Sequence, residues 1–216
     1  ERLCQISDVV TFEFENIDSD LLAELEKDYH IVQSASLLKT AQHRLLEKEF
    51  ARSLGIETVD YQYVDQDTTG VQVDGTYLMK TVRFGYDGKG QSRITEASQV
   101  QAYTLLERLV PLDKEISVVA YKDRTGIGIV AVVENEHRNN ILYRSIVPTT
   151  ASPEQEAQAI DYTRRILEAA DYYGVLTVEF FISQGRVIFN EMAPRVHNSG
   201  HITMQSANKS QFRAHI

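Results

Sequence analysis

Two apolar segments around a Gln-Gly pair constrain the fold of this chain more than any other feature. They span residues 175–183 and 185–195, and their β-branched and aromatic residues predict the two strands of a hairpin. Glu179 lies inside the first segment and Glu191 lies in the second. Because a carboxylate is costly to bury without a cation or a hydrogen-bond donor, these glutamates are the first candidates for a functional site.

The length of the hairpin loop decides whether the two carboxylates meet. A three-residue loop over 184–186 would place Glu179 opposite Glu191 on one face, whereas a two-residue loop would place them on opposite faces. In the first arrangement the carboxylates and Asn190 form an all-oxygen site that suits Mg²⁺, with Mn²⁺ as a second candidate. In the second arrangement one or both glutamates point to solvent. The sequence leaves both arrangements open.

The segments before the hairpin predict its neighbours. Residues 152–174 begin with Ser-Pro, carry Gln155 in the capping-box position and end at a glycine, which predicts an amphipathic helix. Four strand-like segments precede this helix, and the Pro, Gly, Asp and Asn residues between them indicate a largely antiparallel sheet. These segments are residues 102–110, 115–123, 126–136 and 141–147.

The remaining segments complete an α/β fold of the α+β type. Residues 9–14 predict a strand, residues 34–55 one amphipathic helix, and residues 196–216 a final helix. Residues 56–94 consist of short β-like runs joined by Asp, Thr and Gly, which predicts a small β-rich lid.

The composition limits the classes of partner. With 31 acidic and 22 basic residues the formal net charge is -9, so the chain lacks the basic field that nucleic acid or an anionic membrane requires. The single cysteine, Cys4, excludes an internal disulfide and a cysteine-rich zinc site, and it fits a reducing compartment. No apolar run approaches the ~20 residues that span a bilayer. We therefore expect a soluble cytoplasmic protein.

The segment RFGYDGKGQ, residues 83–91, follows a strand-like run and contains three glycines and two cations. A P-loop requires Ser or Thr after Gly-Lys, where this chain has Gly90, and the dinucleotide motif GxGxxG is absent. Asp87 and Gly88 are a strong turn signal, so a simple hairpin turn is an alternative. Lys80, in the preceding run, either extends to solvent or holds nucleotide phosphates beside this loop.

Two further polar clusters are candidates for a site. The segment APRVHNSGH, residues 193–201, places an arginine, two histidines, an asparagine and a serine around one glycine. These side chains either form a polar loop or bind an anion or a substrate. Glu13 and Glu15 lie on the same face at the end of the first predicted strand, where α/β sheets bind ligands.

Six sequence blocks, spread over almost the whole chain, resemble the ATP-grasp enzymes, and among them the N5-carboxyaminoimidazole ribonucleotide synthases. The blocks are DVVTFEFEN, QHRLLEKEFARSLGI, LMKTVRFGYDGKGQ, LLERLVPLDKEISVV, VENEHRNNIL and FNEMAPRVHNSGH. GYDGKGQ together with NEMAPRVHNSGH distinguishes this group from biotin carboxylase and from the formate-dependent glycinamide ribonucleotide transformylase.

The resemblance implies an ATP-grasp fold in four parts. These are the end of a Rossmann-like N-terminal domain (1–33), a connecting helix (34–55), a lid (56–106) and an antiparallel-sheet core (107–216). The first strand and helix of the family's N-terminal domain, and its C-terminal stretch, are missing from this sequence. We therefore expect a chain that is truncated at both ends.

The resemblance also implies an activity. Members of this group carboxylate 5-aminoimidazole ribonucleotide with bicarbonate in purine biosynthesis, and they release ADP and phosphate by way of carboxyphosphate. A homodimer is the expected assembly. The alternatives are another ATP-grasp carboxylase or transformylase, or an ATP-binding module without catalysis.

Each site residue receives its role from the same resemblance. The ATP site comprises Arg44, Lys80, Glu107, Arg108, Leu109, Val110, Glu115, His137, Asn190 and Glu191. The ribonucleotide site comprises Glu13, Tyr86, Asp87, Lys89, Arg195, His197, Asn198 and Ser199. Glu179 and Glu191 are the metal ligands, and Arg195, His197 and Glu191 are the catalytic residues.

Overall fold

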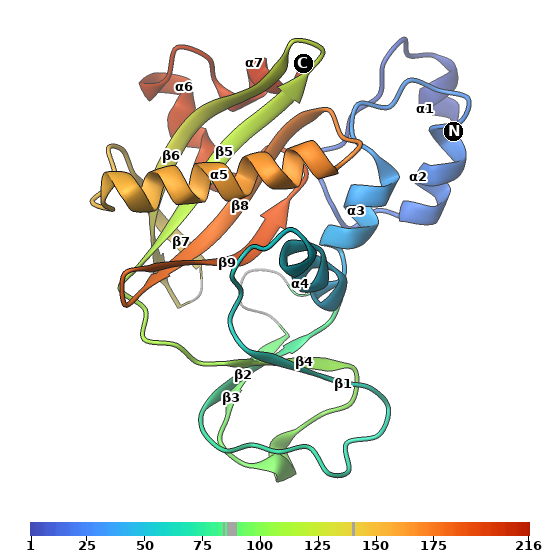
Figure 1. Cartoon of the computed structure of the whole chain (residues 1–216). Coiled ribbons are helices and arrows are strands. Elements are labelled where there is room, and N and C mark those ends of the chain that lie inside the picture. The colour runs from blue at the N-terminus through green and yellow to red at the C-terminus, as the bar shows by residue number, and fades with distance from the viewer. Residues whose placement is uncertain (84, 86–89, 140) are drawn as a thin grey trace.

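The structure, a computed structural model, describes residues 1–83, 85, 90–139 and 141–216. The described strands form two antiparallel sheets, one of four strands in the order β1-β4-β2-β3 and one of five in the order β7-β6-β5-β8-β9. Figure 1 shows the smaller sheet below the larger one, with helix α4 (Arg44–Ser53) at the junction.

The smaller sheet is the β-rich segment that the sequence predicts as a lid. Its strands are β1 (Tyr61–Val64), β2 (Tyr77–Thr81), β3 (Gln91–Ile94) and β4 (Thr104–Arg108), with the 3-10 helix η1 (Ala97–Gln99) before β4. Val64, Met79 and Leu106 are buried together as its core.

The four strand-like segments between residues 102 and 147 do not form one sheet as expected, because the first of them belongs to the smaller sheet. The strand β4 pairs with β1 and β2, because an apolar run predicts a strand without specifying its partner. The four-part division of the chain, with a boundary after residue 106, stays a proposal, and the smaller sheet extends to Arg108.

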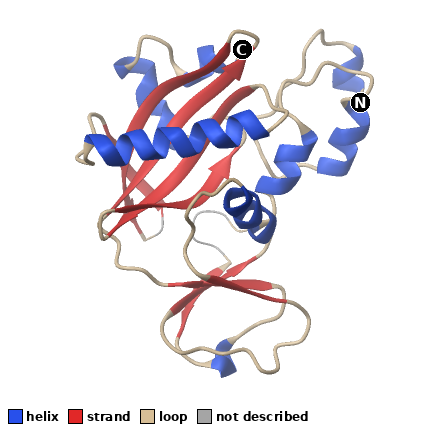
Figure 2. Ribbon diagram, viewed as in Figure 1, coloured by secondary structure: helices blue, strands red, loops and turns tan. Residues whose placement is uncertain are grey.

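The larger sheet carries one long helix across a face (Figure 2). Its strands are β5 (Lys114–Asp123), β6 (Gly126–Arg138), β7 (Ile141–Ile146), β8 (Gly174–Ser183) and β9 (Arg186–Ala193), and the helix is α5 (Pro153–Ala169). Ile166 and Leu167 of α5 are fully buried against Phe180 and other apolar residues of the sheet. Each such side chain contributes roughly 1.5–3 kcal/mol by leaving water.

The predicted capping box of α5 is confirmed. Ser152 Oγ accepts from the N–H of Gln155, and Gln155 Oε1 accepts from the N–H of Ser152. We expect Ser152→Ala to lower the free energy of unfolding by about 1 kcal/mol, because one helix-end N–H loses its acceptor. Urea denaturation would measure this change, with Ser53→Ala, at the end of α4, as the control. Equal stability of the two variants would contradict the capping assignment.

Residues 34–55 form two helices, so the prediction of a single helix was wrong. Helix α3 (Ala35–Ala41) ends before α4 begins, and His43 between them has extended backbone angles of φ -132° and ψ 105°. The Arg44 N–H donates to Val82 O of the lid at 3.0 Å instead of to a helical carbonyl. Gln42 Nε2 donates to the carbonyls of Glu15 and Ile17. The residues at the break therefore form hydrogen bonds with both the lid and the N-terminal segment.

The N-terminal segment contains α1 (Arg2–Gln5) and α2 (Ser19–Leu25) but no strand over residues 9–14. Val10 makes only an isolated bridge to Ile31. Gln33 binds the backbone of Phe12 in place of a neighbouring strand, donating from Nε2 to its carbonyl and accepting its N–H at Oε1. The predicted strand was therefore wrong.

The C-terminal segment divides into η2 (Asn198–Ile202), α6 (Thr203–Ser206) and α7 (Gln211–His215), so the single helix predicted there was also wrong. Gln211 donates to His197 O and accepts from the His197 N–H, which folds the segment back on itself. No helix among the described residues has the length and apolar character needed to cross a membrane.

Candidate active site

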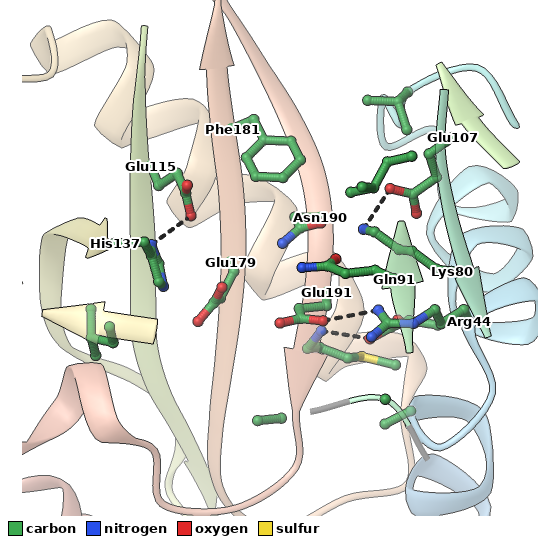
Figure 3. Close-up of a pocket in the computed structure, with 18 of the residues that line it drawn as sticks. Arg44, Lys80, Gln91, Glu107, Glu115, His137, Glu179, Phe181, Asn190 and Glu191 are labelled. Atoms are coloured by element: carbon green, nitrogen blue, oxygen red, sulfur yellow. Dashed lines mark hydrogen bonds and ion pairs between the residues drawn. The ribbon is translucent and has the colours of Figure 1, made fainter. Parts of the chain in front are cut away.

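A cavity of about 640 Å³ lies between the two sheets. It is lined by residues of α3 and α4, of β2, β3 and β4 in the smaller sheet, of all five strands of the larger one, of η2, and of the loops between them. Figure 3 shows the charged side chains that face it. Fourteen predicted site residues line it: Arg44, Lys80, Glu107, Arg108, Leu109, Val110, Glu115, His137, Glu179, Asn190, Glu191, Arg195, His197 and Asn198.

Glu179 of β8 and Glu191 of β9 are directly paired, by a route that the sequence argument did not foresee. The hairpin loop has two residues, Gln184 and Gly185, both with positive φ. Regular pairing from this loop puts Phe180 opposite Phe189, and a register shift then brings Glu179 opposite Glu191. The expectation that a two-residue loop separates the carboxylates was therefore wrong, because Asn190 is an extra residue in a β-bulge.

The two carboxylates differ in protonation although they are neighbours. Glu191 Oε2 lies 3.1 Å from Arg44 Nη1. Burial alone would raise the pKa of Glu191, but Arg44 and then Lys80 hold it below its usual value. Burial, and then the Glu191 carboxylate, raise the pKa of Glu179 to about 8. At neutral pH the pair therefore carries about one negative charge until a cation binds.

His197 lies beside this pair as a neutral group. Its Nε2 is 3.5 Å from Glu179 Oε1, and its Nδ1 is 2.9 Å from Ser199 Oγ. Burial, and then the Arg195 guanidinium, lower the pKa of His197 to about 4. Because His197 is uncharged and Glu179 is largely protonated at neutral pH, their contact is not an ion pair.

Two buried lysines share one carboxylate at the lid side of the cavity. Lys80 Nζ lies 2.6 Å from Glu107 Oε2, and Lys48 Nζ lies 3.2 Å from Glu107 Oε1. Burial would raise the pKa of Glu107, yet Lys48 and then Lys80 lower it to about 2. Two cations against one anion leave a surplus positive charge, which favours an anionic ligand such as a phosphate.

The low pKa of Glu107 predicts a pH dependence of stability. Its folded value of about 2 lies below the usual 4.5, so its contribution is complete above pH 4.5 and is lost as the pH falls toward 2. We expect the difference in unfolding free energy between the wild type and Glu107→Gln to narrow by about 2 kcal/mol between pH 5 and pH 3. Urea denaturation at the two pH values measures it, and a constant difference would refute the assignment.

The far end of the cavity combines an ion pair with apolar walls. His137 Nδ1 lies 3.0 Å from Glu115 Oε2, and this contact raises the pKa of His137. Leu109, Leu142 and Phe181 line the cavity as well. Apolar walls beside a few polar groups suit a flat aromatic ring such as a nucleobase.

The N-terminal segment contributes Glu15, not Glu13, to the cavity. Glu15 lines it and accepts from Arg195 Nε at 3.0 Å, whereas Glu13 is exposed and outside it. The two were predicted on one face, but residues 13–17 bend instead of forming a strand, so their side chains diverge. The proposed substrate contact of Glu13 thus finds no support in this geometry.

Four other residues predicted to bind the ribonucleotide lie either outside the cavity lining or outside the described residues. Ser199 is fully buried outside the cavity lining and contacts His197. Tyr86, Asp87 and Lys89 lie outside the described residues, so their assigned contacts stay predictions.

The residues at the hairpin fit a divalent cation only in part. Among the described residues no three His, Cys, Asp or Glu side chains gather as a metal site. Glu179 and Glu191 supply two carboxylates, and the buried Asn190 Oδ1 has no hydrogen-bond partner there. This oxygen set suits Mg²⁺ when phosphate oxygens and waters complete its shell.

Comparison with known proteins shows the family to which the chain belongs. A sequence model described as the ATP-grasp domain matches residues 49–212. The chain belongs to the ATP-grasp family. The predicted ATP-grasp fold, with a small β-rich sheet and an antiparallel core sheet, is thereby confirmed.

Within the ATP-grasp family the chain is similar to N5-carboxyaminoimidazole ribonucleotide synthases. It is 37% identical to the enzyme of Brucella melitensis over 231 residues, which cover 100% of this chain and 64% of that protein. The solved structure of the Staphylococcus aureus N5-carboxyaminoimidazole synthetase complexed with ADP matches with a TM-score of 0.91 and 33% identity, over 99% of this chain and 61% of that one.

A second solved structure similar to this chain contains a ribonucleotide. It is the N5-carboxyaminoimidazole synthase of Aspergillus clavatus in complex with ADP and 5-aminoimidazole ribonucleotide, with a TM-score of 0.89 and 25% identity. It is matched over 99% of this chain and 60% of that one. The chain thus spans less than two thirds of the length of these relatives.

Sequence reasoning missed two buried ionisable residues of α4, Glu47 and Lys48. Glu47 accepts from the Met192 N–H, and Lys48 pairs with Glu107. The signal was present, because both share the buried face of α4 with Ala51 at helical spacing. A charged residue on an otherwise buried helix stripe calls for a partner, and here the partners are a strand backbone and the lid.

Proposed function

We propose that the complete protein catalyses the ATP-dependent carboxylation of 5-aminoimidazole ribonucleotide with bicarbonate in purine biosynthesis. One observation carries the proposal: the carboxylate pair of the larger sheet and the buried Lys80 of the smaller sheet, which is paired with Glu107, border a single cavity. The synthases to which the chain is similar support the choice of substrate, and one of them has been solved with ADP and this ribonucleotide.

ATP would occupy the part of the cavity between lid and core. Its base would lie among Leu109, Leu142 and Phe181, and its phosphates would approach Lys80 and Arg44, the cations on the lid strand and at the start of α4. A lysine and an arginine that converge on one space are typical of polyphosphate binding.

Glu179, Glu191 and the Asn190 amide oxygen would hold Mg²⁺ or Mn²⁺ at the phosphate end. The cation would neutralise charge on the phosphate oxygens. The two glutamates would fix its position, because they lie opposite one another on neighbouring strands. Arg44 keeps Glu191 ionised, so one carboxylate is ready to bind before the second loses its proton.

Phosphoryl transfer to bicarbonate depends mainly on positioning and charge neutralisation. Lys80 and Arg195 would stabilise negative charge on the transferred phosphoryl and carboxyl oxygens. The amine of the ribonucleotide then attacks the carboxyl carbon, the carbon–oxygen bond to phosphate breaks, and the departing phosphate takes up the proton that the amine loses. His197 is neutral and held by Ser199, so it would orient the amine without repelling it.

The intermediate, carboxyphosphate, is readily hydrolysed, so water has to be excluded while it exists. The smaller sheet and the loop after β2 border the cavity on one side, where Gly85 is among the lining residues. Closure of this loop over the ribonucleotide, by way of Tyr86, Asp87 and Lys89, is part of the proposal. A homodimer and a cytoplasmic location are further parts of it.

The proposal is tested by ADP release from the complete protein with each substrate omitted in turn. ADP should form rapidly only when bicarbonate and 5-aminoimidazole ribonucleotide are both present. Stimulation by formate and glycinamide ribonucleotide instead would favour the related transformylase reaction. Nucleotide binding without any substrate-dependent ADP release would indicate a module without catalysis.

A further inference from the structure

The bulge at Asn190 brings Glu179 and Glu191 together. Without it, the pairing of Phe180 with Phe189 would continue by placing Asn190 opposite Glu179. Glu191 would then lie on the other face of the sheet, away from its partner. Hydrogen bonds from outside the hairpin distinguish the bulged pairing from the regular one.

The hydrogen bonds at the outer edge of β9 show the same shift in register. Phe189 N donates to Glu57 O at 2.8 Å, so the polar groups of Phe189 face away from β8. In a regular strand Asn190 and Met192 would then face inward, toward β8. Instead Asn190 O and Met192 N form hydrogen bonds with side chains of α4.

Two consecutive residues of α4 make these hydrogen bonds. Lys48 Nζ donates to Asn190 O at 2.7 Å and to Phe189 O at 3.4 Å. Glu47 Oε1 accepts from Met192 N at 2.6 Å. Both residues are almost fully buried, at 1% and 2% exposure. Regular pairing would remove both of these contacts with β9 and leave the Lys48 amino group and the Glu47 carboxyl group buried with fewer hydrogen-bond partners, which is unfavourable.

We infer that Lys48, together with Glu47, is a positioning residue that fixes the bulge and thereby sets the two carboxylates opposite one another. The inference rests on the proposed function, in which the two carboxylates hold the metal ion. Lys48 also reaches Glu107 of the lid, so one ammonium connects the helix, the bulge and the strand that carries the lid carboxylate. Neither residue needs to touch a reacting atom for this role.

The test replaces Lys48 with methionine in the complete protein, which keeps the length of the side chain and removes its three donors. Binding of ADP is measured by calorimetry over a series of Mg²⁺ concentrations. The Mg²⁺ concentration for half-maximal binding should rise about 10–100-fold, as it does when a residue that orients metal ligands is lost.

Lys122→Met is the matched control. Lys122 Nζ also donates to two backbone carbonyls, those of Leu167 and Ala170, at 2.8 and 2.9 Å. It lies outside the cavity lining, so its loss should lower thermal stability and leave the Mg²⁺ dependence unchanged. Equal Mg²⁺ dependence of Lys48→Met and Lys122→Met would overturn the inference.

Glu47→Ala provides a second variant if Lys48→Met does not fold. It removes the acceptor for Met192 N and leaves the contact between Lys48 and Glu107, so the Mg²⁺ dependence should shift in the same direction by a smaller factor. In a Glu191→Gln background neither Lys48→Met nor Glu47→Ala should raise the required Mg²⁺ concentration further, because the carboxylate that the bulge positions is already lost. Fully additive shifts would indicate a general loss of stability and overturn the inference.

A crystal structure of Lys48→Met, or of Glu47→Ala, gives a result that does not depend on the reaction. We expect the Glu191 carboxylate to leave its place opposite Glu179, by loss or displacement of the bulge. An unchanged bulge would overturn the inference even if the proposed function holds. If the wild type binds no Mg²⁺ with ADP, the proposed function fails, and this structure still decides whether Lys48 and Glu47 set the pairing.

Discussion

Replacing Glu191 with alanine is expected to abolish substrate-dependent ADP formation, with a loss of at least about a thousandfold. The change removes one of the two opposed carboxylates and leaves Arg44 without its partner. The fold should persist, because Glu191 lies at the cavity and not in the apolar core. A coupled assay of ADP release measures the loss, and circular dichroism checks the fold.

Glu136→Ala is the matched control for this experiment. Glu136 also pairs with arginines, Arg138 and Arg144, but it does so at the surface and outside the cavity. Its loss should leave ADP release within about twofold of the wild type, since exposed ion pairs contribute little. Undiminished ADP release from Glu191→Ala would refute the proposed metal site.

Replacing Lys80 with methionine is expected to reduce kcat/KM for ATP by about a hundredfold or more. Lys80 is buried beside Glu107 and supplies the lid's charge to the cavity. Methionine fills the same space without the charge, so Lys48 alone would then neutralise Glu107 and the positive surplus would vanish. Steady-state kinetics with varied ATP measure the change.

Lys114→Met shows whether the effect is specific to the cavity. Lys114 donates to Thr150 at the surface and is absent from the cavity lining. We expect kinetics close to the wild type for this variant. The alternative that Lys80 extends to solvent was wrong, because its side chain is buried. An unchanged kcat/KM for ATP in Lys80→Met would mean that the lysine only balances the charge of Glu107.

Local signals predicted much of this fold correctly. The Ser-Pro start and Gln155 predicted the beginning of α5, because helix caps are encoded within a few residues. The predicted end at Gly174 was wrong, because the helix ends at Ala169 and Gly174 begins β8. The short β-like runs after residue 56 predicted the smaller sheet, because strand-forming residues and turn residues are also local signals. Most of the predicted site residues line one cavity, since the resemblance assigned them together.

The errors arose where distant contacts override local preference. Residues 34–55 read as one helix, but the Arg44 N–H binds Val82 of the lid and the helix breaks. A two-residue loop predicts opposite faces for Glu179 and Glu191 under regular pairing, and this expectation was wrong because a bulge places them opposite one another. Neither the bulge nor its contacts with Lys48 follow from spacing within the hairpin, because both depend on the docking of α4.

The central claim is that this cavity couples ATP consumption to carboxyl transfer, and bicarbonate labelled with ¹⁸O tests it most directly. If a bicarbonate oxygen attacks the γ-phosphorus, that oxygen stays on phosphate when the amine takes the carboxyl group. Mass spectrometry of the phosphate released by the complete protein should therefore find one ¹⁸O per phosphate, formed together with carboxylated ribonucleotide. Unlabelled phosphate, or phosphate release that does not require bicarbonate, would contradict the account.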